Sequence, residues 1–183
     1  MAILFFEKIP LLGYDMDGSG QKRLAVNILE RIALTALLQN DYLIFYEYDV
    51  KDGETPEIIA DKLYGDSRFH WVVLLTNNIV DPYYDWPMSY ENLMVTIEQK
   101  YATPAHNGLQ YSTQTVHHYE DKQGNYIDLT SFNQLPASER KKVMIYDWEM
   151  ALNESKRRIR LLDASFIDQI DKEADTLLSA PLA

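Results

Sequence analysis

Residues 48–82 read YDVKDGETPEIIADKLYGDSRFHWVVLLTNNIVDP, and this stretch decides the fold. Over residues 44–50, Ile44, Tyr46, Tyr48 and Val50 alternate with Phe45, Glu47 and Asp49. A period of two with this composition predicts a β-strand that has one buried face. Asp52-Gly53 then ends the strand in a turn, because glycine readily adopts a positive φ.

Two short helices are predicted in the middle of this stretch. Thr55 is a suitable N-cap, Pro56 fits the first helical position, and Gly65 is the residue type that ends a helix in the left-handed conformation. A second helix begins after Asp66 or Ser67. It is apolar almost all round, so it should be buried. Its apolar residues are Phe69, Trp71, Val72, Val73, Leu74 and Leu75.

The order strand, turn, helix, glycine, helix and asparagine-rich exit resembles a LysM module. The matching residues are Tyr48-x-Val50-Lys51-x-Gly53-x-Thr55, Ile59-Ala60, and Leu74-x-x-Asn77 with Pro82. The run Asn77-Asn78-Ile79-x-Asp81-Pro82-x-x-Asp85-Trp86-Pro87 is more specific. With this run, the chain resembles the baseplate wedge subunit family of contractile-tailed, T-even-type bacteriophages, which carries a LysM-like domain. Two further motifs typical of this family, Asn27-Ile28-x-x-Arg31 and Asn153-Glu154-x-Lys156-Arg157-x-Ile159, extend the resemblance over nearly the whole chain.

The chain before residue 43 predicts an extended arm followed by a helix. Pro10 disfavours a helix at Ile9, and residues 3–12 carry more apolar side chains than a solvated tail would. Over residues 21–39, apolar residues recur at the helical period, beginning with Leu24, Ala25 and Ile28. We therefore expect an arm over residues 3–15, a loop at residues 17–20 and a helix over residues 21–39.

Beyond Pro82 the pattern departs from an ordinary LysM module. A short strand near residues 84–88 is predicted to complete the core. Leu93 and Ile97 share a helical face and predict a helix over residues 90–101, with a strand as the competing interpretation. Residues 103–108 are predicted to be a linker, residues 114–119 and 125–129 a hairpin, and residues 131–142 a loop. The chain is then predicted to form a strand over residues 159–162 and a final helix over residues 165–178, capped by Ser165.

We therefore predict an α+β protein. It has a small LysM-like β-α-α-β core, an N-terminal arm and helix, a polar β-hairpin and a C-terminal helix. The corresponding division is residues 1–42 for the arm and helix, 43–101 for the LysM-like domain with the following helix, 102–142 for the linker and hairpin, and 143–183 for the C-terminal strand and helix.

Composition limits the classes of protein to which the chain can belong. It has 183 residues, 46% of them hydrophobic, no cysteine, and a formal net charge of −11. It can therefore build a core, but neither a disulfide scaffold nor a thiolate metal site. Acidic side chains outnumber basic ones over residues 41–91, which disfavours nucleic acid and anionic membranes as partners. No apolar run reaches the roughly 18 residues of a membrane span, and no secretory leader is recognisable.

No arrangement of residues in the sequence predicts catalysis. Adjacent residues on a strand point to opposite faces, so His117 and His118 are predicted not to converge on one metal ion. Glu54 and Glu57 flank the start of a helix, where acids commonly complement the helix dipole. His70 is predicted to be a packed or partly exposed side chain and not a catalytic one. We predict no enzyme activity, no cofactor and no metal site.

Aromatic and apolar residues in several places are predicted to bind other proteins. The chain has 13 Tyr and 3 Trp, more than a small core needs, and both residue types are favoured interface anchors. The arm and the final helix carry apolar surface for another chain, and residues 139–160 are basic enough to complement the acidic module. The predicted interface residues are Leu4, Phe5, Phe6, Tyr83, Tyr84, Trp86, Arg157, Phe166, Ile170 and Leu177.

The resemblance implies a structural subunit of a phage tail baseplate wedge, made in the host cytoplasm and built into the virion. It implies binding to the helical core bundle of the wedge and to neighbouring wedge or hub proteins, so that wedges join around the hub. The alternative is a LysM carbohydrate-binding module for N-acetylglucosamine polymers of the peptidoglycan or chitin type. Its groove would lie between residues 52–56 and residues 77–81. The altered exit after Pro82 disfavours this alternative.

Overall fold

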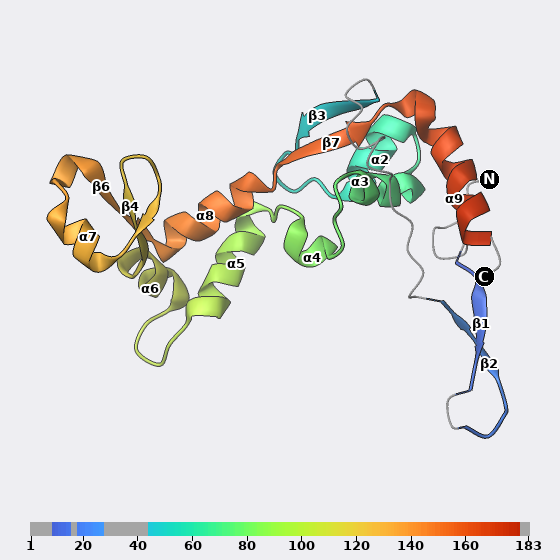
Figure 1. Ribbon diagram of the computed structural model, residues 1–183, viewed down its shortest axis with the longest axis horizontal. Helices are drawn as coiled ribbons and strands as arrows, with labels where there is room; N and C mark the ends of the chain where they lie inside the picture. Colours follow the sequence, from blue (N-terminus) through green and yellow to red (C-terminus); the bar gives the residue numbers. More distant parts are fainter. Residues whose placement is uncertain (1–8, 16–17, 28–43, 180–183) are drawn as a thin grey trace. The chain divides into compact units, whose positions relative to one another are not determined.

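The computed structural model describes residues 9–15, 18–27 and 44–179, and Figure 1 gives the element labels. Helices alternate with small antiparallel sheets, so the fold is α+β as predicted. The elements are β1 (Leu11–Tyr14), β2 (Arg23–Val26), β3 (Phe45–Asp49), α2 (Pro56–Tyr64), α3 (His70–Thr76), α4 (Pro82–Asp85), α5 (Tyr90–Tyr101), α6 (Gly108–Gln114), β4 (Val116–Asp121), β5 (Tyr126–Ile127), α7 (Leu129–Gln134), β6 (Arg140–Met144), α8 (Ile145–Ser155), β7 (Arg158–Leu162) and α9 (Ile167–Ser179). Short 3-10 turns lie at Ser67–Phe69, Ala137–Glu139 and Ala164–Phe166.

The chain divides into two compact units. Unit 1 comprises Met1–Asp49, Glu54–Asp85 and Ile159–Ala183. Unit 2 comprises Val50–Gly53 and Trp86–Arg158. In the sequence, most of unit 2 is therefore inserted between α4 and β7.

The strand that pairs with β3 is β7, so the second strand of the β-α-α-β arrangement does not follow α3 directly but comes after α8 in the sequence. The strand predicted near residues 84–88 is wrong, because residues Pro82–Asp85 form α4. Asp81 accepts a hydrogen bond from the Tyr83 N–H at 3.0 Å, and Pro82 occupies the first helical position, where no N–H is needed. An aspartate followed by proline thus starts a helix here.

The caps predicted for α2 are confirmed. Thr55 Oγ1 accepts a hydrogen bond from the Ile58 N–H at 3.4 Å, Pro56 is the first residue, and Gly65 ends the helix with a φ of 74°. Asp66 caps the 3-10 turn that leads into α3 by accepting a hydrogen bond from the Arg68 N–H at 2.9 Å. These local signals fix both helices independently of the rest of the chain.

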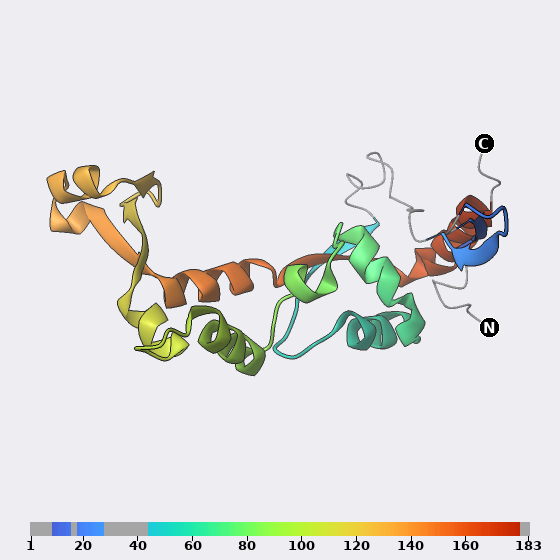
Figure 2. The same cartoon turned by 90° about the horizontal axis from the view of Figure 1, so that it is seen from below.

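The core of unit 1 forms where α3, β7 and α9 meet (Figures 1 and 2). Trp71 and Val72 of α3 pack with Leu162 of β7 and with Ile167 and Ala174 of α9. The prediction that the second helix is buried is therefore confirmed. The partly buried hydrophobic residues around this cluster are Ile44, Phe45, Tyr64, Phe69, Leu75, Phe166 and Ile170.

Unit 2 contains a three-stranded antiparallel sheet in the order β5-β4-β6. The predicted hairpin is confirmed, with Tyr119 opposite Ile127 and Glu120 opposite Tyr126. The predicted loop over residues 131–142 is wrong at both ends, because α7 and β6 occupy them. α6 and α8 were also not predicted, although Asn107 accepts a hydrogen bond from the Gln110 N–H at 2.7 Å and so caps α6.

Two other predicted helices and one predicted strand are confirmed in large part. α5 covers the residues predicted, with Ser89 as its N-cap. β7 contains the predicted strand over residues 159–162. α9 is present, but the predicted cap is wrong: Asp163, not Ser165, caps the turn before it by accepting a hydrogen bond from the Ser165 N–H at 2.9 Å.

β1 and β2 form an antiparallel hairpin in which Leu11 lies opposite Val26 and Tyr14 lies opposite Arg23. The helix predicted over residues 21–39 is therefore wrong at its start, and its remainder lies largely outside the described residues. The Asn27 N–H donates to the Pro10 carbonyl at 3.0 Å and closes the base of the hairpin. Pairing with β1 outweighs the helical spacing of the apolar residues. None of the helices in the described residues is long and apolar enough to cross a bilayer.

Candidate protein-binding surfaces

α4 presents two tyrosines to solvent. Tyr83 is 86% exposed and Tyr84 is 71% exposed, and Val80, just before the helix, is 71% exposed. The Asp85 N–H donates to the Asp81 carbonyl at 2.8 Å, and the Asp81 N–H donates to Asp85 Oδ2 at 3.2 Å. The two rings therefore project from a short helix that is hydrogen-bonded at both ends. Little backbone entropy remains to be lost when such a helix binds a partner.

Two other predicted interface residues, Trp86 and Arg157, are engaged inside unit 2. Trp86 is 7% exposed. The Arg157 guanidinium donates to the Val50 carbonyl at 3.0 Å, to Asp52 at 3.0 Å and to Glu154 at 2.9 Å. Arg157 therefore ties the turn at residues 50–53 to the end of α8, and its side chain is only 18% exposed.

The predicted interface residues of α9 lie in two environments. Phe166 and Ile170 are partly buried against the core of their own unit. Leu177 is 59% exposed, whereas its neighbour Leu178 is 1% exposed. Of the three predicted interface residues in this segment, Leu177 is therefore the one available to bind another protein.

The β1–β2 hairpin is a second exposed apolar surface, where the sequence predicted the end of an arm, a loop and the start of a helix. Both strands are exposed along their whole length. An isolated two-stranded hairpin is marginally stable in water, so such a surface calls for a cover. The predicted residues Leu4, Phe5 and Phe6 lie outside the described residues. The exposed large apolar residues of the hairpin are Leu11, Leu12, Tyr14, Leu24 and Val26.

Glu54, predicted to complement the dipole of α2, is buried and bonded in unit 1. Its carboxylate accepts hydrogen bonds from the Tyr48 hydroxyl at 2.8 Å and from Lys62 Nζ at 2.6 Å. Burial, with the hydrogen bond to Glu54, raises the pKa of Tyr48 to about 12. The carboxylate thus joins β3 to α2 and does not form an acid–base pair with Glu57.

Asn77, in the groove predicted for sugar, is bonded to the chain itself. Its amide nitrogen donates to the Arg160 carbonyl at 2.7 Å and to the Val73 carbonyl at 2.8 Å. Its amide oxygen accepts a hydrogen bond from the Arg160 N–H at 2.8 Å. The amide thus pairs with β7 as a neighbouring strand would, and it holds the end of α3 against β7.

Replacing Asn77 with aspartate should destabilise unit 1 by about 1–3 kcal/mol, because the Val73 and Arg160 carbonyls lose the Asn77 amide as a donor and face a carboxylate instead. The measurement is the midpoint of urea unfolding followed by fluorescence. Asn133→Asp is the matched control, since Asn133 is exposed on α7. Equal midpoints for both variants would contradict the assigned role of Asn77.

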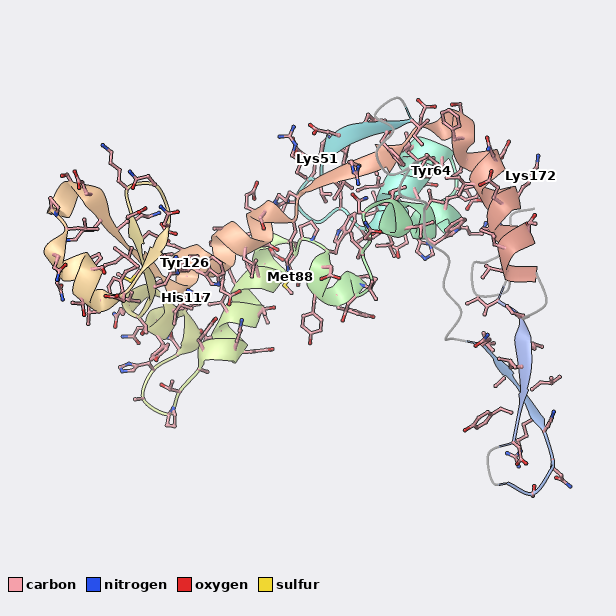
Figure 3. All side chains as sticks on the ribbon, in the orientation of Figure 1. Lys51, Tyr64, Met88, His117, Tyr126 and Lys172 are labelled. Carbon is pink, nitrogen blue, oxygen red and sulfur yellow. The ribbon has the colours of Figure 1, made fainter. Side chains whose placement is uncertain are left out.

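The prediction that His117 and His118 point apart is wrong. The β4–β6 register shifts between Val116 and His118, so His117 is the extra residue of a bulge. The two Nδ1 atoms lie 2.7 Å apart, and His117 stacks on Trp148 with ring centroids 4.9 Å apart. His118 Nε2 lies 2.9 Å from the Glu120 carboxylate, and the His118 ring centroid lies 4.2 Å from that of Tyr126, which Figure 3 labels. The histidines therefore belong to an aromatic cluster of unit 2.

Glu149 is buried in unit 2 and lies close to two donors. Lys100 Nζ lies 2.7 Å from its carboxylate and the Tyr101 hydroxyl lies 2.6 Å from it. Burial raises the pKa of Glu149, but these hydrogen bonds outweigh burial, and the net pKa is lowered. The ionised carboxylate therefore bonds α8 to α5.

Because the folded-state pKa of Glu149 is lowered, its contribution to stability is present above the unfolded-state pKa and is lost as pH falls. We expect the unfolding free energy of the wild-type chain to decline more steeply than that of Glu149→Gln as pH falls below about 5. Urea unfolding at a series of pH values measures both slopes. Parallel slopes would show that Glu149 titrates alike in the folded and unfolded chain.

In the described part of the chain, no group of three or more His, Asp or Glu side chains is placed to hold a metal ion. His70 Nδ1 lies 3.1 Å from the Ser67 carbonyl. An open depression of about 400 Å³ lies along α9 and the turn before it. Its lining side chains are all polar: Ser165, Asp168, Gln169, Lys172, Glu173 and Thr176.

Comparison with known proteins assigns the family. The family model described as base plate wedge protein 53 matches residues 5–171. Baseplate wedge protein gp53 of Enterobacteria phage T4 is 30% identical over 89 residues, which are 49% of this chain and 42% of that protein. The match to this relative thus covers less than half of its length, whereas the family model covers most of the chain. The chain therefore belongs to the base plate wedge protein 53 family, a family of tail baseplate proteins of the virion.

Proposed function

We propose that the chain is a structural subunit that binds neighbouring wedge proteins through exposed apolar surfaces and catalyses no reaction. The T4 relative is named as a baseplate wedge protein, which supports this class of function. Assembly into a wedge requires surfaces that remain exposed when the chain has folded. Among the described residues of unit 1, such surfaces include the α4 tyrosines, the β1–β2 hairpin and Leu177.

The observation that carries the proposal is the exposure of Tyr83 and Tyr84 on α4. Tyrosine is enriched among the residues that dominate binding energy, because it buries a large ring with few rotatable bonds. Exposed single apolar residues are ordinary on any protein. Two adjacent tyrosines and Val80, around a helix fixed by Asp81 and Asp85, form a patch with the composition of an interface core.

The β1–β2 hairpin and Leu177 supply further contacts in this proposal. Both faces of the hairpin carry exposed apolar side chains, with Leu11, Leu24 and Val26 on one face and Leu12 and Tyr14 on the other. A neighbouring protein that covers either face would stabilise the hairpin as it binds. Such an arm extends the reach of the chain and would help to join adjacent wedges around the hub.

We further propose that the β-α-α-β part of unit 1 serves as a LysM-like module that binds protein and not sugar. The engagement of Asn77 with β7 supports this choice, because the exit of the second helix then has its amide bonded within the fold. Glu54, at the other side of the groove predicted for sugar, is likewise buried. Polar groups already paired inside the fold offer little to a sugar ring.

The test is to mix the purified full-length chain with the other wedge proteins of the same phage. Sedimentation velocity should show the chain moving with the wedge complex, and calorimetry with N-acetylglucosamine oligomers should show no binding. A chain that sediments alone, or one that binds the oligomers at micromolar concentration, would overturn the proposed function.

A further inference from the structure

The two adjacent histidines of β4 are not used by the function proposed above, which rests on unit 1. In a regular strand they would point to opposite faces, but the register shift between Val116 and His118 brings both rings to Trp148. Their Nδ1 atoms lie 2.7 Å apart, which is a hydrogen-bond distance. One of these two nitrogens must therefore carry a proton, and the other must not.

Glu120 determines where the protons of the neutral pair lie. Its carboxylate lies 2.9 Å from His118 Nε2 and has no proton to donate, so His118 carries a proton on Nε2. Nδ1 of the neutral His118 ring is then bare, and His117 Nδ1 donates to it. The neutral pair thus forms a chain of two hydrogen bonds that runs from His117 through His118 to Glu120.

The contact between the two rings is compatible with one positive charge but not with two. A first added proton can bind His117 Nε2, or it can charge His118 while His117 Nδ1 becomes the acceptor. In either case one proton still lies between the two Nδ1 atoms. A second added proton leaves two N–H groups facing each other across 2.7 Å. Two donors form no hydrogen bond and two cations repel, so the rings must separate.

The pair connects β4 to α8 through Trp148. His117 stacks on the indole with ring centroids 4.9 Å apart and an interplanar angle of 12°, and His118 meets it edge-on at 5.4 Å. The His118 side chain is only 10% exposed, so its Nδ1–H has no acceptor after the rings separate unless water enters. Separation of the rings therefore requires a local movement of the bulge against α8.

The groups around the pair do not relieve a second charge. Lys141 lies 3.9 Å from the Glu120 carboxylate and adds positive charge beside the pair. Glu149 interacts electrostatically with His117, but its carboxylate is already bonded to two donors. α7 also packs on β4 and carries no titratable side chain. The titratable side chains around the pair include Glu120 of β4, Tyr126 of β5, Lys141 of β6 and Glu149 of α8.

We propose that the His117–His118 pair is a pH-sensitive latch between β4 and α8. A single proton between the rings holds the latch closed at neutral pH. Histidine side chains change charge between about pH 5 and 8, so acidification through this range opens the latch once both rings are charged. Opening moves the bulge away from Trp148 and changes the surface of unit 2. The core cluster of unit 1 contains neither histidine and keeps its packing.

The test is ¹H–¹⁵N NMR of the full-length chain, including the histidine ring nitrogens, over a titration from about pH 8 to pH 5. At the start, His117 should be protonated on Nδ1 and His118 on Nε2. The largest movement of the Trp148 indole signal should accompany the second of the two histidine charging steps, because the rings separate in that step.

Two variants separate the latch from an ordinary effect of charge. His117→Phe keeps a ring on Trp148 but cannot be protonated, so its Trp148 signal should move much less than that of the wild type. His106→Gln is the matched control, since His106 is exposed in the loop before α6. Its Trp148 signal should move as in the wild type.

The proposal is overturned if both histidines carry the same tautomer at the start, because the chain of hydrogen bonds is then absent. It is also overturned if the Trp148 signal stays in place down to about pH 5, or if His117→Phe responds as fully as the wild type. Should His117→Phe fail to fold, the wild-type tautomers and the step in which Trp148 moves decide. Wedge binding is not measured in this titration, so the latch and the proposed function can fail independently.

Discussion

Replacing Trp71 with alanine should lower the free energy of unfolding of unit 1 by about 3–5 kcal/mol, the usual cost of truncating a buried tryptophan. Trp71 is 6% exposed and lies in the cluster that joins α3 to Leu162 of β7 and to Ile167 and Ala174 of α9. The cavity would therefore weaken contacts between segments that are far apart in the sequence. Thermal unfolding of the purified chain, followed by circular dichroism, measures the loss.

Tyr83→Ala is the matched control for Trp71→Ala, because it also removes an aromatic ring from unit 1. Tyr83 is 86% exposed, so its truncation should change stability by no more than about 0.5 kcal/mol. A melting temperature unchanged by Trp71→Ala would mean that Trp71 is not part of the core. Equal losses for the two variants would mean that Tyr83 is covered within the chain.

Gly108→Ala should destabilise unit 2 by about 3 kcal/mol or more, since overpacking against backbone leaves little room for relaxation. Gly108 is the first residue of α6, and a Cβ added there would overlap the Glu98 carbonyl oxygen of α5. The other nearest atoms are also Glu98 backbone, at 2.7 Å. Because α5 cannot move aside as a side chain could, the two helices would have to separate.

Gly53→Ala separates this clash from ordinary backbone strain. Gly53 has a φ of 77°, but a Cβ there would meet nothing within 4 Å. The expected loss is about 1 kcal/mol, which is the cost of placing alanine in the left-handed region. Urea unfolding of both variants compares the two losses. A Gly108→Ala variant no less stable than Gly53→Ala would show that α5 and α6 do not approach so closely.

Elements fixed by neighbouring residues could be predicted from the sequence. Thr55, Pro56 and Gly65 define α2 by capping chemistry that needs no contact from elsewhere. Ser89 defines the start of α5 in the same way. Asp81-Pro82 is an equally clear start of a helix. A strand was predicted here instead, because the resembled LysM module has its second strand at this point.

Elements fixed by distant pairing could not be predicted. β2 depends on β1, and the partner of β3 is β7, which follows the whole of Trp86–Arg158 in the sequence. The approach of His117 to His118 depends on a bulge that β6 imposes on β4. Strand pairing and bulges of this kind arise from tertiary contacts, which a single sequence does not display.

For the predicted interface residues, too, the residue type could be read from the sequence but the exposure could not. Apolar character singled out Tyr83, Tyr84 and Trp86 together, yet the fold leaves the first two exposed and buries the third. Arg157 was chosen for its charge, and the fold uses that charge within unit 2. The exposed hairpin residues, such as Leu24, were not predicted as surface residues, because their spacing indicated a helix. Exposure is a property of the folded chain, so composition alone could not assign it.

The most direct test of the account is sedimentation velocity of wedge proteins mixed with the chain carrying Tyr83→Ser and Tyr84→Ser together. Both side chains are exposed, so the double variant should melt at the wild-type temperature. We expect this folded variant to sediment alone while the wild-type chain moves with the wedge complex. Equal incorporation of the double variant and the wild type would contradict the assignment of α4 as the principal binding surface.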